Sequence, residues 1–165
     1  MTAPLTPEQL FAHLDALGIE TRTHHHAPVA TVDEANEVWA GIDGLHCKNL
    51  FLKDAKAKLW LVVARADFRL DLKSLPARIG SARLSFGSAA LLEEVLGVKP
   101  GSVTPFAVVN DRDRRVDVVL DAEIARHDRV CFHPLINTMT TEIASGDLPT
   151  FLRDWGGSWQ IVELP

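Results

Sequence analysis

The spacing of apolar residues in the first forty positions predicts two helices with a short strand between them. Leucines recur at helical spacing over residues 10–17, and the preceding Thr-Pro-Glu-Gln at 6–9 has the composition of a capping box. An extended segment is predicted over 20–24. The Thr-Val-Asp-Glu run at 31–34 repeats the capping pattern, so a second helix should begin there and end near Ala40.

The middle of the chain predicts paired strands followed by less regular structure. Apolar and β-branched residues fill 47–53 and 58–64, and the intervening 54–57 suits a hairpin loop. Residues 70–77 have the pattern of a short helix, and 82–86 that of an irregular or extended segment.

The last half of the chain mixes hairpins with helical connections. Such a mixture predicts an α+β fold, in one domain over residues 1–165, with a mixed, largely antiparallel sheet flanked by helices. The expected elements are a helix at 88–96, a loop at 100–105, a hairpin of strands 106–110 and 116–120, strands at 129–133 and 138–143, a helix at 148–155 and a strand at 159–163.

Composition and length are those of an ordinary globular protein. The 165 residues suit one domain, and 47% of them are apolar and 24% charged. No stretch approaches the roughly 18 apolar residues of a membrane span, and the N-terminus lacks the pattern of a signal peptide. The two cysteines make no disulfide framework. We therefore expect a cytoplasmic protein.

The charge of the chain is unevenly distributed. The whole sequence has a net charge of −5, yet residues 48–83 hold nine Lys and Arg against three Asp and Glu, a balance of +6. A polyanion needs a local cationic surface rather than a basic protein. The middle segment is therefore a candidate nucleic-acid-binding surface, although strands and loops could also scatter these charges over several faces.

Two polar residues in apolar surroundings are candidates for chemistry. Lys48 precedes Leu-Phe-Leu, and an ammonium beside a half-buried strand favours an anion or a carbonyl as partner. His133 ends a short apolar strand just before Pro134, where its ring could bind an amine or relay a proton. A surface lysine and a structural histidine are the alternative interpretations.

The loop that begins at Gly101 is a third candidate. Glycine allows close approach of backbone to a ligand, and Pro105 stiffens the loop. The N–H groups of Gly101, Ser102, Val103 and Thr104 could then clamp an oxyanion. The same spacing also suits a plain helix-to-strand connection.

The histidine run 24–26 raises the possibility of a metal-dependent hydrolase, with His24, His26 and Cys131 as ligands. Against it, consecutive residues on a strand alternate faces, and no C-x-x-C or H-E-x-x-H motif is present. Phosphate-loop and G-x-S-x-G motifs are absent as well. We therefore expect neither metal nor cofactor.

Three strings occur in an order that resembles a known family. They are Cys-Lys-Asn-Leu-Phe-Leu-Lys-Asp at 47–54, the Gly101-x-x-x-Pro105-Phe106 loop, and Phe-His-Pro-Leu-Ile-Asn-Thr at 132–138. Together they resemble the free-standing prolyl-tRNA editing proteins, which are relatives of the YbaK-like proteins and of the editing insertion of bacterial prolyl-tRNA synthetases. The resemblance covers nearly the whole chain.

The resemblance implies an aminoacyl-tRNA hydrolase that cleaves the ester of mischarged tRNA(Pro). Asn49 after Lys48 resembles the alanyl-specific branch, whereas relatives with threonine there tend to act on cysteinyl-tRNA(Pro). By motif, Lys48 corresponds to the essential lysine, Asn49 to its neighbour in the pocket and His133 to the pocket histidine. The loop lining the aminoacyl site corresponds to Gly101, Ser102, Val103, Thr104, Pro105 and Phe106.

The implied partner is mischarged tRNA(Pro), with prolyl-tRNA synthetase or an elongation factor as transient partners and neither DNA nor membrane. Candidate phosphate contacts are Lys53, Lys56, Lys58 and Arg78. Two alternatives stay open beside the metal-dependent hydrolase. One is a deacylase for another small amino acid, cysteine or serine, and the other is a non-catalytic module that binds tRNA or the synthetase.

Overall fold

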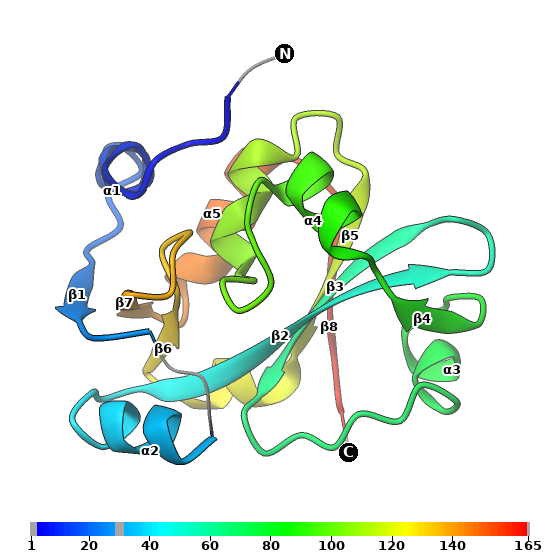
Figure 1. Cartoon of the computed structure of the whole chain (residues 1–165), viewed down its shortest axis with the longest axis horizontal. Coiled ribbons are helices and arrows are strands. Elements are labelled where there is room, and N and C mark those ends of the chain that lie inside the picture. The colour runs from blue at the N-terminus through cyan, green and yellow to red at the C-terminus, as the bar shows by residue number, and fades with distance from the viewer. Residues whose placement is uncertain (1–2, 29–31, 165) are drawn as a thin grey trace.

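The computed structural model describes residues 3–28 and 32–164, which form a mixed sheet of eight strands (Figure 1). The strand order is β1-β7-β6-β2-β3-β5-β8, and the short β4 also pairs with β2. Four strand pairings are antiparallel and three are parallel. The strands are β1 (Arg22–His25), β2 (Leu45–Asp54), β3 (Leu59–Arg65), β4 (Leu84–Phe86), β5 (Val116–Asp121), β6 (Arg129–Phe132), β7 (Met139–Ala144) and β8 (Trp159–Val162).

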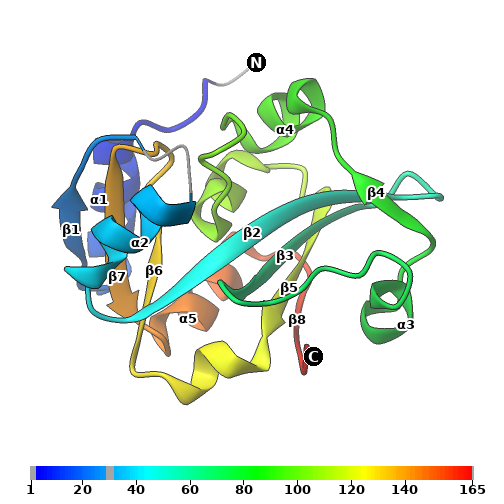
Figure 2. The same cartoon turned by 60° about the horizontal axis from the view of Figure 1, so that its bottom comes forward.

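Strand β2 joins the two halves of the sheet. Its first residues, Leu45 and His46, pair in parallel with β6, and the rest pairs antiparallel with β3. Strand β6 ends at Phe132, so β2 and β6 separate after only two paired positions. Figure 2 shows β2 running from the β6–β7 half toward β3 and β4. We call the point of separation the fork.

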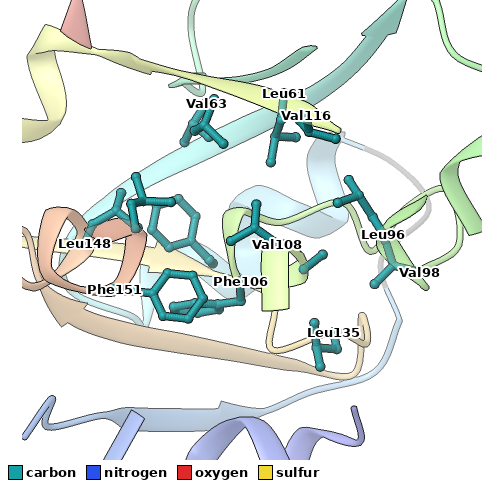
Figure 3. Close-up of a cluster of buried hydrophobic side chains, with 14 of the residues drawn as sticks. Leu61, Val63, Leu96, Val98, Phe106, Val108, Val116, Leu135, Leu148 and Phe151 are labelled. Carbon is teal, nitrogen blue, oxygen red and sulfur yellow. The ribbon is translucent and has the colours of Figure 1, made fainter. Parts of the chain in front are cut away.

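Helices pack on the sheet and close its main core. They are α1 (Pro7–Ala16), α2 (Val32–Ala40), α3 (Leu75–Ile79), α4 (Ala89–Leu96) and α5 (Asp147–Trp155), with 3₁₀ turns η1 (Pro105–Asn110) and η2 (Ala122–Arg126). The ring of Phe106 on η1 meets those of Phe132 and Phe151 edge-on, each with centroids 5.6 Å apart. Figure 3 shows Phe106 and Phe151 among the buried side chains of the main core. None of the described helices is long and apolar enough to cross a membrane.

Local capping signals are confirmed where the structure describes them. Thr6 accepts from the Gln9 N–H, and the Gln9 side chain accepts from the Thr6 N–H, which is the predicted capping box of α1. Ser88 caps α4, and Gly97 ends it in the left-handed conformation. The predicted cap at Thr31 lies outside the described residues.

Two sequence predictions of local structure are wrong. Residues 106–110 form η1 rather than a hairpin strand, because Pro105 starts the turn and the Thr104 hydroxyl accepts from the Phe106 N–H. Strand β5 instead pairs in parallel with β3 and β8. The helix predicted at 70–77 is α3, which begins only at Leu75, since Pro76 lacks an N–H and suits a first helical turn.

A buried carboxylate organises the β2–β3 hairpin. Asp54 is 5% exposed and accepts hydrogen bonds from the backbone of Lys56, Lys58 and Ala82 and from the Trp60 indole. Burial alone would raise the pKa of Asp54, but these hydrogen bonds, led by that of Trp60, outweigh it and hold the pKa below its usual value. The ionised carboxylate therefore ties the hairpin tip to the segment before β4.

Replacing Asp54 by asparagine should lower the free energy of unfolding by about 1–3 kcal/mol, because an amide NH₂ cannot accept from the buried donors. Urea denaturation at neutral pH measures the change. Exposed Asp113→Asn is the control, and it should shift stability by no more than about 0.5 kcal/mol.

The stability difference between the wild type and Asp54→Asn should also depend on pH. Because the folded-state pKa of Asp54 lies below its unfolded value near 4, its stabilisation is complete above that pH and is lost as pH falls through the folded-state pKa. The difference between the wild type and Asp54→Asn should therefore shrink below about pH 4. A difference that stayed constant on acidification would contradict the assignment.

Candidate functional site

A small pocket opens at the fork between β2 and β6. It has a volume of about 20 Å³, which holds about one water-sized group. On the α2 side, the rings of Trp39 and His46 stack with centroids 4.8 Å apart. Figure 2 shows α2 beside the first residues of β2. The pocket is lined by Trp39, His46, Cys47, Asn49, Cys131, Phe132, His133 and Thr140.

His133, which lines this pocket, has one unprotonated ring nitrogen. Its Nδ1 lies 2.9 Å from the carbonyl oxygen of Met139, which can only accept, so Nδ1 carries the proton. Burial lowers the pKa of His133 more than this hydrogen bond raises it, and nearby His26 lowers it further. The ring is therefore neutral at pH 7, with Nε2 as an acceptor.

Asn49 brings an acceptor without a partner. Its Oδ1 is buried and forms no hydrogen bond within the described part of the chain. Leaving a buried acceptor unpaired costs about 1–3 kcal/mol, so such atoms in native proteins call for an explanation. A ligand that donates a hydrogen bond to Asn49 Oδ1 would provide that explanation.

Lys48 precedes Asn49 on β2 and therefore points to the opposite side of the strand. It is half-buried, with Nζ 5.6 Å from the ring centroid of Phe68, and it does not line the pocket. Among the described residues it forms no ion pair. The structure thus brings Asn49 and His133 to one pocket and places the ammonium of Lys48, unpaired among the described residues, on the opposite face of β2.

The predicted loop approaches the segment that follows His133 but does not line the pocket. Gly101 has a φ of +91°, and a Cβ there would lie 3.7 Å from Nδ2 of Asn137, in the segment that follows His133. The Ser102 N–H already donates to the Lys99 carbonyl. Thr104 and Phe106 are fully buried. None of the predicted loop residues, Gly101, Ser102, Val103, Thr104, Pro105 and Phe106, lines the pocket.

The predicted tRNA-binding cations differ in how they are engaged. Lys53 and Lys56 are exposed and form no ion pair with other described residues. Lys58 pairs with Asp117 at 2.8 Å, and its Nζ lies 4.8 Å from the ring centroid of Trp60. Arg78 is exposed on α3 and donates weakly, at 3.4 Å, to a backbone carbonyl. Lys53 and Lys56 are therefore the most available for a polyanion.

The chain matches one protein family over most of its length. The family model described as the aminoacyl-tRNA editing domain matches residues 26–151. This chain belongs to the aminoacyl-tRNA editing domain family. The match includes β2, the fork and the segment that carries His133, so the pocket lies within the shared domain.

Relatives of this editing domain come from bacteria and animals. Over 158 residues the chain is 36% identical to the prolyl-tRNA editing protein ProX of Acetoanaerobium sticklandii, covering 95% of this chain and 96% of the relative. It is 38% identical over 149 residues to prolyl-tRNA synthetase associated domain-containing protein 1 of Danio rerio, covering 89% and 81%.

The fold agrees with that of a solved structure described as a candidate trans-editing enzyme for prolyl tRNA synthetase. The TM-score is 0.71 at 17% identity, and the superposition covers 98% of this chain and 99% of the other. At this identity the likeness establishes the fold, and it confirms the predicted α+β architecture with a mixed sheet and flanking helices.

The side chains considered as metal ligands in this editing domain are buried thiols or histidines that bond to other side chains. Burial raises the pKa of Cys131 to about 12 and that of Cys47 further, so both stay protonated. His24 bonds to Glu142 and His26 to Thr140. In the described ranges no three His, Cys, Asp or Glu side chains are grouped to hold a metal ion.

Sequence reasoning missed two side chains that line the pocket. Neither His46 nor Thr140 lies in a recognisable chemical motif, and only the pairing of β2, β6 and β7 brings them to the fork. Trp39 is a third lining residue that the sequence did not indicate, and its ring stacks on that of His46.

Substitution of Asn49 by leucine should leave the editing domain as stable as the wild type or stabilise it by up to about 1 kcal/mol, because an unsatisfied acceptor is removed. The matched control is Asn110→Leu. Both amide atoms of Asn110 are bonded, to the Leu5 N–H and the Leu96 carbonyl at 2.9 Å each, so its loss should destabilise by about 1–3 kcal/mol. Urea denaturation separates the two. Equal destabilisation by both would show that Asn49 is a structural residue.

Proposed function

We propose that this protein is a trans-editing deacylase that hydrolyses the ester of alanyl-tRNA(Pro). The observation that carries the proposal is the small pocket at the fork, which is lined both by Asn49, whose amide oxygen is unpaired, and by the neutral ring of His133. Membership of the editing domain family and the printed names of its prolyl-tRNA relatives support the choice of tRNA.

The reaction needs positioning more than a nucleophilic side chain. An aminoacyl ester is already reactive, and both cysteine thiols are protonated. In the proposed step a water oxygen bonds to the ester carbonyl carbon, the bond from that carbon to the ribose oxygen breaks, and one water proton ends on the ribose oxygen. The Nε2 of His133 accepts a hydrogen bond from the water and orients it. The products are free alanine and uncharged tRNA.

Lys48 has a separate task in this proposal. Its ammonium lies outside the pocket and is unpaired among the described residues, so it suits the terminal phosphate of the acceptor end. The ring of Phe68 beneath Nζ holds the lysine without neutralising it. Gripping the RNA at this point fixes the ester at the mouth of the pocket.

The basic segment extends the grip along the RNA. Exposed Lys53, Lys56 and Arg83 lie around the β2–β3 tip and β4, and no ion pair with described residues neutralises them. Phe86 on β4 is 60% exposed beside them. Cations with an exposed aromatic ring are the combination that binds phosphate and stacks on a base.

Amino-acid discrimination has to come from a second site. Alanine is smaller than proline, so a synthetase pocket shaped for proline cannot exclude it, since missing methylenes cost only about 1–3 kcal/mol each. An editing pocket that accepts only a small group removes what the first site lets through. The narrow space at the fork suits that task.

The proposal is tested by a panel of alanyl-, cysteinyl-, seryl- and prolyl-tRNA(Pro) under single-turnover conditions. Alanyl-tRNA(Pro) should be hydrolysed fastest and prolyl-tRNA(Pro) spared. Preference for the cysteinyl or seryl ester would reassign the substrate. Binding of all four without hydrolysis would indicate a non-catalytic module.

Lys48→Met keeps the apolar stem over Phe68 and removes the charge, so it should slow deacylation of alanyl-tRNA(Pro) by at least about 100-fold without unfolding the protein. Lys73→Met, an exposed lysine in the same basic segment, is the matched control and should change the rate little. A near-normal single-turnover rate for Lys48→Met would remove Lys48 from the mechanism.

A further inference from the structure

Strand β8 leaves one hydrogen-bonding edge of the sheet unpaired. It is the last strand in the sheet order and pairs in parallel with β5, and no other described strand pairs with its outer edge (Figure 2). The Val118 N–H donates to the Ser158 carbonyl, and Val118 is the ladder partner of Trp159. Because a parallel ladder uses alternate residues of a strand, the N–H and C=O groups of Trp159 and Ile161 point away from β5.

The outer edge of β8 lacks the features that keep edge strands from pairing. Residues 159–162 are Trp-Gln-Ile-Val, with neither a charge nor a proline, and Ile161 is 50% exposed. The strand at the opposite end of the sheet, β1, carries Arg22 and two histidines. Charges and prolines on an edge strand oppose pairing with another chain, whereas an apolar edge favours it. A further strand is therefore expected at β8 rather than at β1.

A second copy of β8 fits this edge in one antiparallel register. A two-fold axis at Gln160 places Trp159 opposite the partner's Ile161, and Ile161 opposite the partner's Trp159. All four backbone groups that these two residues direct outward then bond to the partner. Each pair also sets an aromatic ring beside a β-branched side chain, a combination that stabilises antiparallel strands. The ladder ends at Val162, because the Glu163 carbonyl already accepts from Arg78 at 3.4 Å.

Charges at the ends of β8 complement one another in this register. The guanidinium carbon of Arg153 lies 5.8 Å from the ring centroid of Trp159, and Arg153 forms no ion pair with the described residues. The partner's Glu163 comes opposite Gly157, diagonally next to Trp159. Glu163 pairs with Arg126 of its own chain, yet its side chain is 66% exposed. By symmetry each copy brings a carboxylate toward an unpaired guanidinium of the other.

We infer that this protein forms a symmetric dimer in which β8 pairs antiparallel with the partner's β8 about a two-fold axis at Gln160. The dimer joins the two sheets into one. In the sheet order β3 and β5 separate β8 from β2, so the pairing leaves the fork and Lys48 outside the interface. The inference therefore does not depend on the proposed deacylase activity.

Cross-linking across the two-fold axis tests the register. Gln160 lies opposite the partner's Gln160 in a pair without backbone hydrogen bonds, in which Cα atoms are about 4.5 Å apart, a distance that a disulfide spans. Gln160→Cys should therefore give a covalent dimer when oxidised glutathione takes up the two thiol hydrogens. The wild type, which retains Cys47 and Cys131, is the background control and should remain monomeric under denaturing conditions.

Val162→Cys is the matched control for the register. The same axis places Val162 opposite the partner's Ser158, so the two introduced thiols would be four residues apart along the ladder, or about 13 Å, which no disulfide spans. Cross-linking that is equal in the two variants, stronger in Val162→Cys or absent from both would overturn the inference.

Sedimentation velocity without RNA measures the association itself. The average mass should rise from 18.2 kDa toward twice that value between about 10 μM and about 1 mM protein, because a four-residue ladder is a small interface. Ile161→Lys brings a cation toward the partner's Arg153 and should raise the dimer dissociation constant at least about tenfold. Ile136→Lys, at another exposed isoleucine, should leave it unchanged.

A wild-type mass that stays at 18.2 kDa over this range, or equal dissociation constants for Ile161→Lys and the wild type, would overturn the dimer. Deacylation separates this result from the proposed function. Ile161→Lys lies outside the candidate site, so its single-turnover rate should equal that of the wild type. Loss of dimerisation in Ile161→Lys with an unchanged rate would support the inference.

Discussion

The candidate site depends on the short pairing between β2 and β6. A strand has two hydrogen-bonding edges, and β2 gives one edge to β3 along most of its length. Its other edge pairs with β6 at only two positions before β6 ends at Phe132. Beyond that point β2 crosses to the other half of the sheet, which leaves side chains of both strands around an unfilled space. A longer ladder between β2 and β6 would close it.

Elsewhere in the described residues the buried side-chain nitrogens and oxygens have hydrogen-bond partners, and this contrast marks the pocket. Asp54 accepts four hydrogen bonds, Asp121 pairs with Arg65, and buried Glu142 bonds to Arg129 at 2.6 Å. Asp54 holds the β2–β3 hairpin, Asp121 caps the η2 turn, and Glu142 links β7 to β6. The described part of the chain leaves a single buried side-chain oxygen or nitrogen without a partner, Oδ1 of Asn49, and it lies at the fork. The scaffold is therefore complete, and the site is the place where an acceptor is kept free.

Apolar periodicity and capping residues predict most elements correctly. In segments such as α1, α4, β2 and β3, the local preference of the sequence matches the structure that the fold requires. The strand predicted at 106–110 failed because an apolar run of five residues does not distinguish a strand from a buried 3₁₀ turn. The sequence motifs predicted Asn49 and His133 as pocket residues, and both line the same pocket. The place of Thr140 at the pocket could not be predicted, since it follows from the register of β6 on β7.

The most direct test of the site is a crystal structure of the protein with a non-hydrolysable alanyl amide of 3′-amino-adenosine. The account predicts the alanyl group inside the pocket at the fork, with a hydrogen-bond donor of the analogue within about 3.2 Å of Asn49 Oδ1 and the 5′ end of the nucleoside toward Lys48. An analogue seated elsewhere, such as the groove between α1 and β1 lined by Phe11, Thr23 and Ile136, with the fork left empty, would contradict it.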